Sequence, residues 1–182
     1  MEAAENRYRA FLNGDKAAFA SLVEEYRPGL IRFVNSYVHD VHTAEDIAID
    51  CFAYLLAHPR RYRFTSPLKS YLYTVGRSRA VDWLRRAKRA KTVPLEEAED
   101  EIAGLYLPQN ATEQQERYAA LYRAMEALPE DMRRAVTLYY FDGLSYKQIA
   151  AVLGKSNKQV DNLLYRAKTR LRAILEEGGE AQ

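Results

Sequence analysis

Apolar residues recur in the first part of this chain at the three- and four-residue spacing of amphipathic helices. The first such pattern covers residues 4–13 and ends at Gly14, a common helix stop. Asp15 is predicted to cap a second helix, whose apolar face continues to Tyr37. Pro28 lies within that face. Because proline lacks an N–H and clashes with the preceding turn, we expect the helix to kink or break there.

Two further helices are predicted in the same half of the chain. Thr43 and Asp46 resemble a capping box that opens a third helix, which runs to about Ala57. Ser66 followed by Pro67 opens a fourth and longer helix, since proline is tolerated in a first turn. The apolar side of that helix is predicted to consist of Leu68, Leu72, Val75 and Trp83.

An acidic segment with two prolines and a glycine separates these helices from the next ones. One helix is predicted from near Thr112 to Leu128, and another from Pro129 to a stop at Gly143. No alternating strand pattern occurs, so the predicted fold is all-α, with two small helical domains joined by a flexible acidic linker. The predicted parts are a domain over 1–91, the linker over 92–111 and a domain over 112–182.

The C-terminal part has the pattern of a helix-turn-helix, with a short helix, a glycine turn and a longer helix. Ser145 with Gln148 and Ser156 with Gln159 form two capping boxes, and Gly154 permits the turn between the helices. The second helix is predicted to bury Val160, Leu163, Leu164 and Ala167. Its exposed face is predicted to consist of Asn157, Lys158, Asp161, Asn162, Tyr165, Arg166 and Lys168.

The chemistry of that exposed face favours DNA binding. Amide and guanidinium groups near the start of a recognition helix can read base edges in the major groove, and cations neutralise phosphates. The alternative from spacing alone is a helical hairpin with an ordinary solvated basic face. The two capping boxes and the basic residues that follow favour the DNA-binding interpretation. Those residues are Arg166, Lys168, Arg170 and Arg172.

The net charge of +2 conceals an uneven distribution. Residues 1–90 carry 15 Lys/Arg against 10 Asp/Glu, residues 91–116 carry one against seven, and residues 117–182 carry 11 against eight. Residues 60–91 alone hold 11 basic side chains and one acidic residue, Asp82. Two basic modules therefore flank an acidic connector, a pattern that indicates nucleic-acid binding.

Cysteine use and hydropathy indicate the compartment. Cys51 is the single cysteine, which excludes an internal disulfide and is typical of a reducing cytosol. The polar N-terminus lacks a signal-peptide pattern, and no apolar run reaches the roughly 18 residues that span a bilayer. We therefore expect a cytoplasmic protein without membrane insertion.

Cations alternate with aromatic residues in the loop and helix after residue 60. This combination is typical of proteins that bind single-stranded nucleic acid, because aromatic faces stack on unpaired bases while cations hold the backbone. Trp83 lies on the apolar side of the helix and is expected in the core. Tyr73 projects with Lys69 and Arg77 on another side, and Phe64 lies in the loop, so these two aromatics are the predicted stacking residues. An ordinary solvated surface is the alternative.

The third helix carries two apolar stripes. Ala44, Ile47, Cys51 and Leu55 point one way and are expected in the core. The opposite stripe is flanked by carboxylates, which predicts a protein partner with basic residues beside a hydrophobic groove. The alternative is that Ile49 is a single exposed apolar residue. The opposite stripe and its carboxylates are Asp46, Ile49, Asp50, Ala53 and Leu56.

Two blocks of the chain resemble a known family, the extracytoplasmic-function sigma factors. Region 2 of that family is similar to AEDIAIDCFAYLLAH followed by SPLKSYLYTVGRSRAVDWLRR, and region 4 to LPEDMRRAVTLYYFDGLSYKQIAAVLGKSNKQVDNLLYRAKTRLR. With AFASLVEEYRPGLIRFVNSYV, the resemblance covers nearly everything except the linker and the extreme termini. It implies a non-enzymatic initiation factor without cofactor or metal, whose partners are core RNA polymerase and promoter DNA, both duplex and single-stranded. An anti-sigma protein is the further partner class that the family implies.

The resemblance also implies roles for individual residues. Asp46 and Asp50 match acidic positions that dock on a coiled coil of the largest polymerase subunit, and Ile49 and Ala53 belong to the same stripe. The loop that captures a flipped base of the minus-ten element matches Arg63, Phe64, Thr65 and Ser66. The start of the adjoining melting and recognition helix matches Lys69, Tyr73, Arg77 and Ser78. The minus-thirty-five recognition helix matches Asn157, Lys158, Asp161, Asn162, Tyr165 and Arg166, with Lys168 following as a basic position.

Three residues depart from the family pattern. Ile49 replaces a frequent Gln in the docking helix, and Ser78 replaces a common Asn at the minus-ten site. Asp161 replaces a frequent basic residue in the recognition helix. An acid there cannot pair with phosphate and instead favours a cytosine amino group, so the family's commonest minus-thirty-five sequence is not expected.

Two other classes of function compete with this one. A dimeric helix-turn-helix repressor or activator explains residues 129–172 but leaves the aromatic and basic N-terminal module without a role. A nuclease or metal-dependent hydrolase would have to use His39, His42 and Cys51, whose spacing matches no closed zinc set. We therefore expect no catalytic residue in this chain.

Overall fold

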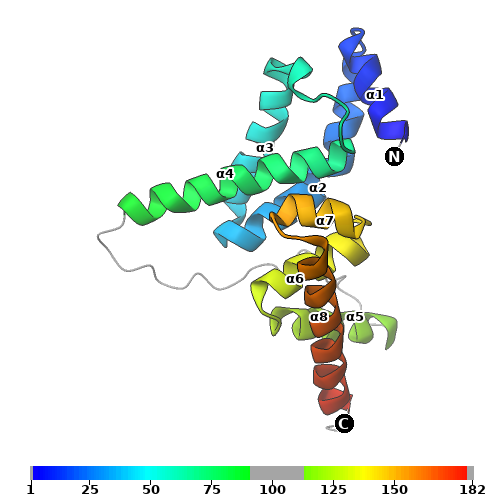
Figure 1. Ribbon diagram of the computed structural model, residues 1–182, viewed down its shortest axis with the longest axis vertical. Coiled ribbons are helices and arrows are strands. Elements are labelled where there is room, and N and C mark those ends of the chain that lie inside the picture. Colours follow the sequence, from blue (N-terminus) through cyan, green and yellow to red (C-terminus); the bar gives the residue numbers. More distant parts are fainter. Residues whose placement is uncertain (1, 91–112, 180–182) are drawn as a thin grey trace. The chain divides into compact units, whose positions relative to one another are not determined.

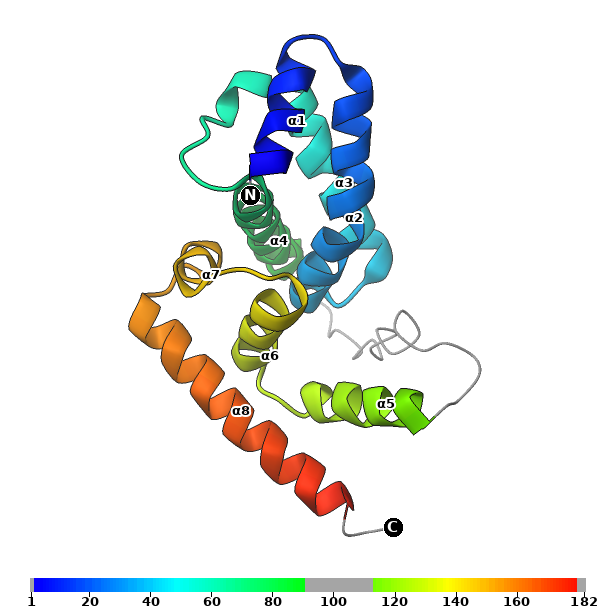
Figure 2. The same ribbon diagram turned by 90° about the vertical axis from the view of Figure 1, so that its right-hand side faces the viewer.

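The computed structural model describes residues 2–90 and 113–179. Within them every regular element is helical, which confirms the predicted all-α fold of two helical domains. The chain divides into two compact units, residues 1–99 and 100–182, which run from blue to green and from yellow-green to red in Figures 1 and 2. The predicted linker, 92–111, lies outside the described residues.

Unit 1 is built around α2, which packs against the three other long helices and lies beside α1 in Figure 2. Leu30, Phe33 and Val34 on its inner side are buried. α4 approaches α2 closely at Gly76, where a Cβ atom would lie 2.9 Å from Cδ1 of Leu30. The glycine therefore makes room for the contact between these two helices. The elements of unit 1 are α1 (Glu2–Leu12), α2 (Lys16–Val38), α3 (Val41–Ala57), the 3-10 turn η1 (Pro59–Arg61) and α4 (Leu68–Ala90).

α2 and α3 each differ from the sequence prediction in one respect. α2 runs through Pro28 without interruption, because buried residues on both sides of it, Tyr26 and Leu30, hold the two halves of α2 in one core. α3 begins before the expected box, since Asp40 is its N-cap and accepts a hydrogen bond from the N–H of Thr43 at 2.6 Å. Hydrogen bonding with Thr43 also holds the pKa of Asp40 below its ordinary value.

Unit 2 is built around α8, which packs against α5, α6 and α7. Its core includes Leu138, Ile149, Val152 and Val160, all fully buried. The other helices are short, so α8 supplies the long surface on which they meet. The elements of unit 2 are α5 (Glu113–Glu126), α6 (Glu130–Val136), the π-helical turn η3 (Thr137–Phe141), α7 (Tyr146–Leu153) and α8 (Asn157–Gly179).

α7 and α8 form the predicted helix-turn-helix. Gly154 joins them with φ of 65°, a left-handed conformation that glycine adopts without a steric cost. Both predicted capping boxes are present. The N–H of Ser145 donates to Oε1 of Gln148 at 2.6 Å, and the N–H of Ser156 donates to Oε1 of Gln159 at 2.7 Å, with the reciprocal bonds at 3.4 and 3.2 Å. Local sequence therefore fixes where both helices start.

Among the helices that the structure describes, none is both long enough and apolar enough to cross a bilayer.

Candidate polymerase and nucleic-acid interfaces

The outer side of α3 carries an apolar stripe that the core of unit 1 does not use. Ile47 is 7% exposed, whereas Ile49, two residues later, is 50% exposed. Leu56 extends the exposed stripe towards the end of the helix. Positions three, four and seven residues apart share one side of a helix. The predicted docking residues therefore form one solvent-facing surface, here called the α3 face: Asp46, Ile49, Asp50 and Ala53.

One carboxylate of the α3 face has a cation beside it. Nη1 of Arg79 lies 3.4 Å from Oδ2 of Asp50, and the Arg79 guanidinium also lies over the ring of Tyr54 at 5.4 Å. The Asp50 side chain is nevertheless 67% exposed. An ion pair this open to water contributes about 0–1 kcal/mol, so the carboxylate can exchange Arg79 for a cation of a partner at little cost.

The alternative of a metal-dependent hydrolase would use His39, His42 and Cys51, and the structure does not bring these three together as a metal site. Cys51 is buried on the inner side of α3, and burial raises the pKa of its thiol to about 12. His39 is the C-cap of α2, with φ of 53°, and His42 is exposed. In residues 2–90 and 113–179, no group of three or more His, Cys, Asp or Glu side chains is arranged to hold a metal ion.

The loop between η1 and α4 presents the predicted base-capture residues around a buried tyrosine. The hydroxyl of Tyr62 donates to the carbonyl oxygen of Ser66 at 2.6 Å, which closes the loop on itself. Arg63 and Thr65 are exposed, as is Ser66. Phe64 is half-buried and has φ of 58°, a conformation that is rare for a bulky residue. Holding it there costs about 1–3 kcal/mol, which the surrounding contacts must offset.

A shallow cationic hollow adjoins this loop. Its volume is about 510 Å³, and three arginines, Arg60, Arg61 and Arg63, line it together with His58 and Pro59. Guanidinium groups bind phosphate oxygens with high geometric specificity. The hollow can therefore hold a nucleic-acid backbone next to a base at Phe64.

Tyr73 is a core residue, so the prediction that it stacks on a base is wrong. Its exposed fraction is 0%, and its ring centroid lies 5.0 Å from that of Phe33 on α2. Lys69 lies outside it, with Nζ 5.8 Å from the ring centroid. A base cannot reach a ring that is covered in this way.

The error has a physical cause in the way α4 packs. The buried side of α4 runs through Tyr73, Gly76 and Ala80, whereas Val75 and Trp83 are only half-buried. α2 comes close at Gly76 and leaves no room there for a larger side chain, and the buried Ala80 is also small. Small residues give little hydrophobic signal. Three other predicted minus-ten residues remain accessible, with Lys69 and Arg77 half-buried and Ser78 exposed.

The outer face of α8 is polar and open to solvent. Val160, Leu164 and Ala167 on its inner side are buried. Tyr165 on the outer side is 73% exposed. Every residue predicted for the minus-thirty-five helix is exposed: Asn157, Lys158, Asp161, Asn162, Tyr165, Arg166 and Lys168.

A charged network that the sequence did not reveal ties α6 to the turn before α8. Nζ of Lys155, in that turn, lies 2.8 Å from Oδ2 of Asp131. The buried Arg134 lies 2.6 Å from Oε2 of Glu130 and 3.5 Å from Oδ1 of Asp131. The hydrogen bond with Lys155 holds the pKa of Asp131 below its ordinary value. The network therefore braces the orientation of α8 relative to α6.

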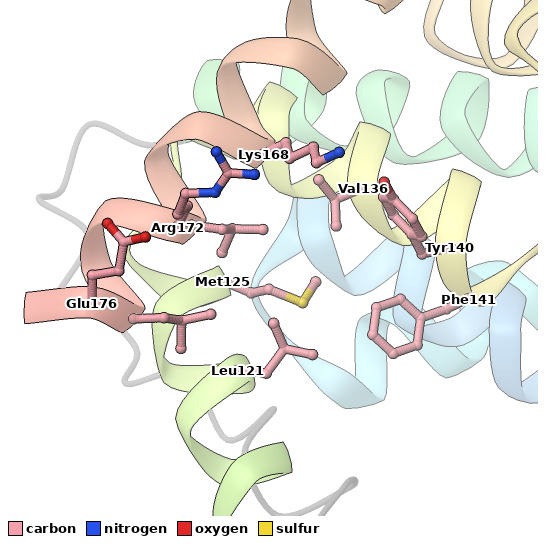
Figure 3. A pocket seen from close by; sticks show the side chains of 10 residues that line it. Leu121, Met125, Val136, Tyr140, Phe141, Lys168, Arg172 and Glu176 are labelled. Atoms are coloured by element: carbon pink, nitrogen blue, oxygen red, sulfur yellow. The ribbon is translucent and has the colours of Figure 1, made fainter. Parts of the chain in front are cut away.

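An apolar pocket of about 540 Å³ lies on the side of α8 that faces α5 and η3. Figure 3 shows Leu121, Met125 and Phe141 on its walls, with Lys168 and Arg172 extending from α8. Lys168 lines this pocket and lies two turns beyond Asp161 along α8. That position suits a phosphate contact better than a base contact.

The sequence interpretation missed one group of residues near the minus-ten loop. Arg9 on α1 lies over the ring of Phe64, with its Cζ atom 4.2 Å from the ring centroid. Tyr8 on the same helix is fully buried and donates a hydrogen bond to the carbonyl oxygen of Pro59 at 2.9 Å. These contacts join segments more than fifty residues apart, and a helical pattern by itself contains no signal for them.

Comparison with known proteins gives two matches to family models. The model described as Sigma-70 region 2 matches residues 22–90, and the model described as Sigma-70, region 4 matches residues 118–171.

Curated relatives match along most of their length. The ECF RNA polymerase sigma factor SigM of Bacillus subtilis is 31% identical over 161 residues, which cover 86% of this chain and 94% of the relative. The ECF RNA polymerase sigma-E factor of Escherichia coli is 30% identical over 163 residues, covering 85% of each. The RNA polymerase sigma-H factor of Pseudomonas aeruginosa is 29% identical, covering 85% of this chain and 84% of the relative.

Two solved structures share the fold. The sigma factor RpoE in complex with the anti-sigma factor NepR, from Bartonella quintana, has a TM-score of 0.62 at 23% identity and covers 87% of this chain and 96% of its own. CnrH in complex with the cytosolic domain of CnrY has a TM-score of 0.64 at 22% identity and covers 96% of this chain and 98% of its own.

Proposed function

The chain belongs to the extracytoplasmic-function RNA polymerase sigma factors, and from this membership we propose that it binds core polymerase and directs initiation at promoters with defined minus-thirty-five and minus-ten elements. In this proposal residues 1–91 dock on polymerase and open the minus-ten region. Residues 112–182 read the minus-thirty-five element, and 92–111 connect the two.

Docking is assigned to the α3 face. It combines exposed apolar side chains with two carboxylates, and the core of unit 1 uses neither. Such a surface suits a partner helix with apolar and basic residues. Asp46 and Asp50 would pair with the basic residues, while Ile49 and Ala53 bury apolar area.

Minus-ten recognition is assigned to the loop before α4 and the first turns of that helix. Phe64 would contact the captured base, and the arginines of the adjoining hollow would hold the backbone. Lys69, Arg77 and Ser78 continue this surface along α4, and Tyr73 supports it from the core.

The observation that carries the proposal is the exposed polar face of α8, in a helix-turn-helix whose two helices each start with a complete capping box. Its first turns present amide and carboxylate groups, Asn157, Asp161 and Asn162, where a recognition helix contacts bases. Arg166 and Lys168 lie further along, where cations contact phosphates.

The partners in this proposal are core RNA polymerase and promoter DNA, with an anti-sigma protein as the class of inhibitor. The complex of RpoE with NepR is an example of a related fold bound by an anti-sigma factor. We assign this chain no catalytic group and no cofactor, and we place it in the cytoplasm with its polymerase.

In vitro transcription from a pool of randomised promoters tests the proposal. Core polymerase supplied with the full chain should initiate at templates enriched in one sequence near minus ten and another near minus thirty-five, whereas core alone should enrich neither. A dimeric repressor or activator behaves differently: the chain would bind a duplex site tightly without polymerase and would not direct initiation.

A charge reversal separates docking from DNA recognition. Asp50→Lys should lower the affinity for core polymerase while leaving the helical circular-dichroism spectrum intact. Glu24→Lys makes the same charge change on an exposed position of α2 and serves as the matched control. Equal affinities of the two variants for core would show that the α3 face is not the docking surface.

A further inference from the structure

α1 contacts the minus-ten loop and the two elements that flank it, η1 and α4, although α1 lies outside the matched region 2, residues 22–90. At the first residue of η1, the hydroxyl of Tyr8 donates to the carbonyl oxygen of Pro59 at 2.9 Å. Burial raises the pKa of Tyr8 to about 12, so the phenol keeps its proton and remains a donor. This bond fixes the chain where η1 begins.

At the end of the loop, α1 caps α4. The N–H of Leu68, the first residue of α4, donates to Oε1 of Glu5 at 3.0 Å. The first N–H groups of a helix have no partner within the helix, and a carboxylate there also interacts favourably with the helix dipole. Glu5 thus performs the function of an N-cap from 63 residues away along the chain.

In the middle of the loop, α1 packs against Phe64, which stays partly exposed. The guanidinium of Arg9 lies 4.2 Å from the ring centroid, and the rings of Tyr8 and Tyr62 pack against the same phenylalanine at 6.0 and 4.7 Å. Phe64 has an unfavourable left-handed backbone, with φ of 58°. Contacts of this kind can offset the cost of that conformation.

We propose that α1 is a working part of the base-capture site: Glu5 and Tyr8 hold the two ends of the loop, and Arg9 is a positioning residue that sets the ring of Phe64 for the unpaired base. This inference rests on the proposed minus-ten function. Arg9 acts through Phe64, so its loss affects recognition of the base more than contact with the backbone.

The test compares two single-stranded minus-ten oligonucleotides bound by reconstituted holoenzyme, one carrying the captured base and one with an abasic site at that position. Stacking predicts that wild type prefers the intact oligonucleotide by about 5- to 150-fold. Arg9→Ala should reduce this preference about two- to fivefold, the value of an exposed cation–π contact, and Arg9→Lys should lose less. Lys16→Ala removes a cation from an exposed position on α2 and should leave the preference unchanged.

The outcomes separate this inference from the function on which it rests. If wild type shows no preference, base capture itself is wrong and the inference falls with it. If wild type discriminates and Arg9→Ala discriminates equally well, only the role of α1 is refuted. An equal loss on both oligonucleotides would make Arg9 a backbone contact, which also overturns its positioning role.

A second measurement examines the loop without DNA. Hydrogen exchange of the Leu68 amide, followed by NMR in the full chain, should accelerate at least severalfold in Glu5→Ala. Glu5→Gln keeps the carbonyl oxygen that accepts the bond and should retain most of the protection. Exchange in Glu5→Ala at the wild-type rate would show that Glu5 does not cap α4.

Discussion

Replacing Ile49 with alanine should weaken docking on core polymerase without destabilising the chain. Full burial of an isoleucine side chain contributes about 1.5–3 kcal/mol. Ile49 is 50% exposed, so a partner can bury only this exposed half of the side chain. The corresponding free energy is half of the full value, about 0.8–1.5 kcal/mol. This corresponds to a loss of about 4- to 12-fold in affinity for core. Fluorescence anisotropy of the labelled chain titrated with core polymerase measures it.

Ile47 provides the matched comparison, since it lies on the same helix and is 7% exposed. Ile47→Ala should cost about 2–5 kcal/mol of folding stability, whereas Ile49→Ala should change stability by less than about 0.5 kcal/mol. Urea unfolding measures both values. An unchanged affinity of Ile49→Ala for core would refute the reasoning, because the apolar stripe would then have no partner on polymerase.

Four more predictions follow from the structure. Phe64→Gly removes the ring, so opening of a duplex promoter should fall more than binding to a pre-melted one. Because glycine adopts the left-handed backbone at this position freely, the thermal unfolding temperature of the protein should stay the same or rise. Asp161→Arg should change the minus-thirty-five sequences enriched from randomised promoters, whereas Lys168→Ala should weaken all of them and make the salt dependence shallower. Tyr73→Ala should destabilise unit 1 by about 3–5 kcal/mol in urea unfolding, and Tyr73→Phe should leave promoter opening intact. Because the pKa of Asp131 is lowered in the folded state, its stabilisation is present above the ordinary aspartate pKa and is lost as pH falls below about 4. Hydrogen exchange of peptides from α6 and α7 should show this loss, and Asp131→Asn should make it smaller.

The sequence predicted where helices lie, and which side of each is buried, when large side chains show the helical period clearly. On α3 the buried Ile47 and Cys51 and the exposed Ile49 all fell where the spacing predicted. On α8 the inner Val160 and Leu164 did the same. On each of these helices large residues such as Ile47 and Leu164 mark the apolar side, so their period and their burial agree, although Leu163, also predicted to be buried, is half-buried.

The pattern was less informative where packing depends on small residues or distant partners. α4 approaches α2 closely at Gly76, and this side of α4, which includes Tyr73, faces the core. Asp40 displaced the expected cap of α3 because several polar residues stood close together, and each of them can cap a helix. The brace between Asp131 and Lys155 crosses from one element to another, and periodicity cannot reveal such a pair.

The two proposed DNA-binding surfaces differ in which contacts hold them in place. The α8 face depends on capping bonds that span three residues, so its reading residues can be exchanged without altering a distant segment. The minus-ten loop depends on hydrogen bonds that span 51 and 63 residues, from Tyr8 and Glu5. Minus-thirty-five preference should thus transfer to a related sigma factor when the outer residues of its recognition helix are replaced with those of α8. Minus-ten preference should transfer only when the loop and its α1 contacts move together, because a transplanted loop without Glu5, Tyr8 and Arg9 loses the contacts that hold Phe64 in its strained conformation.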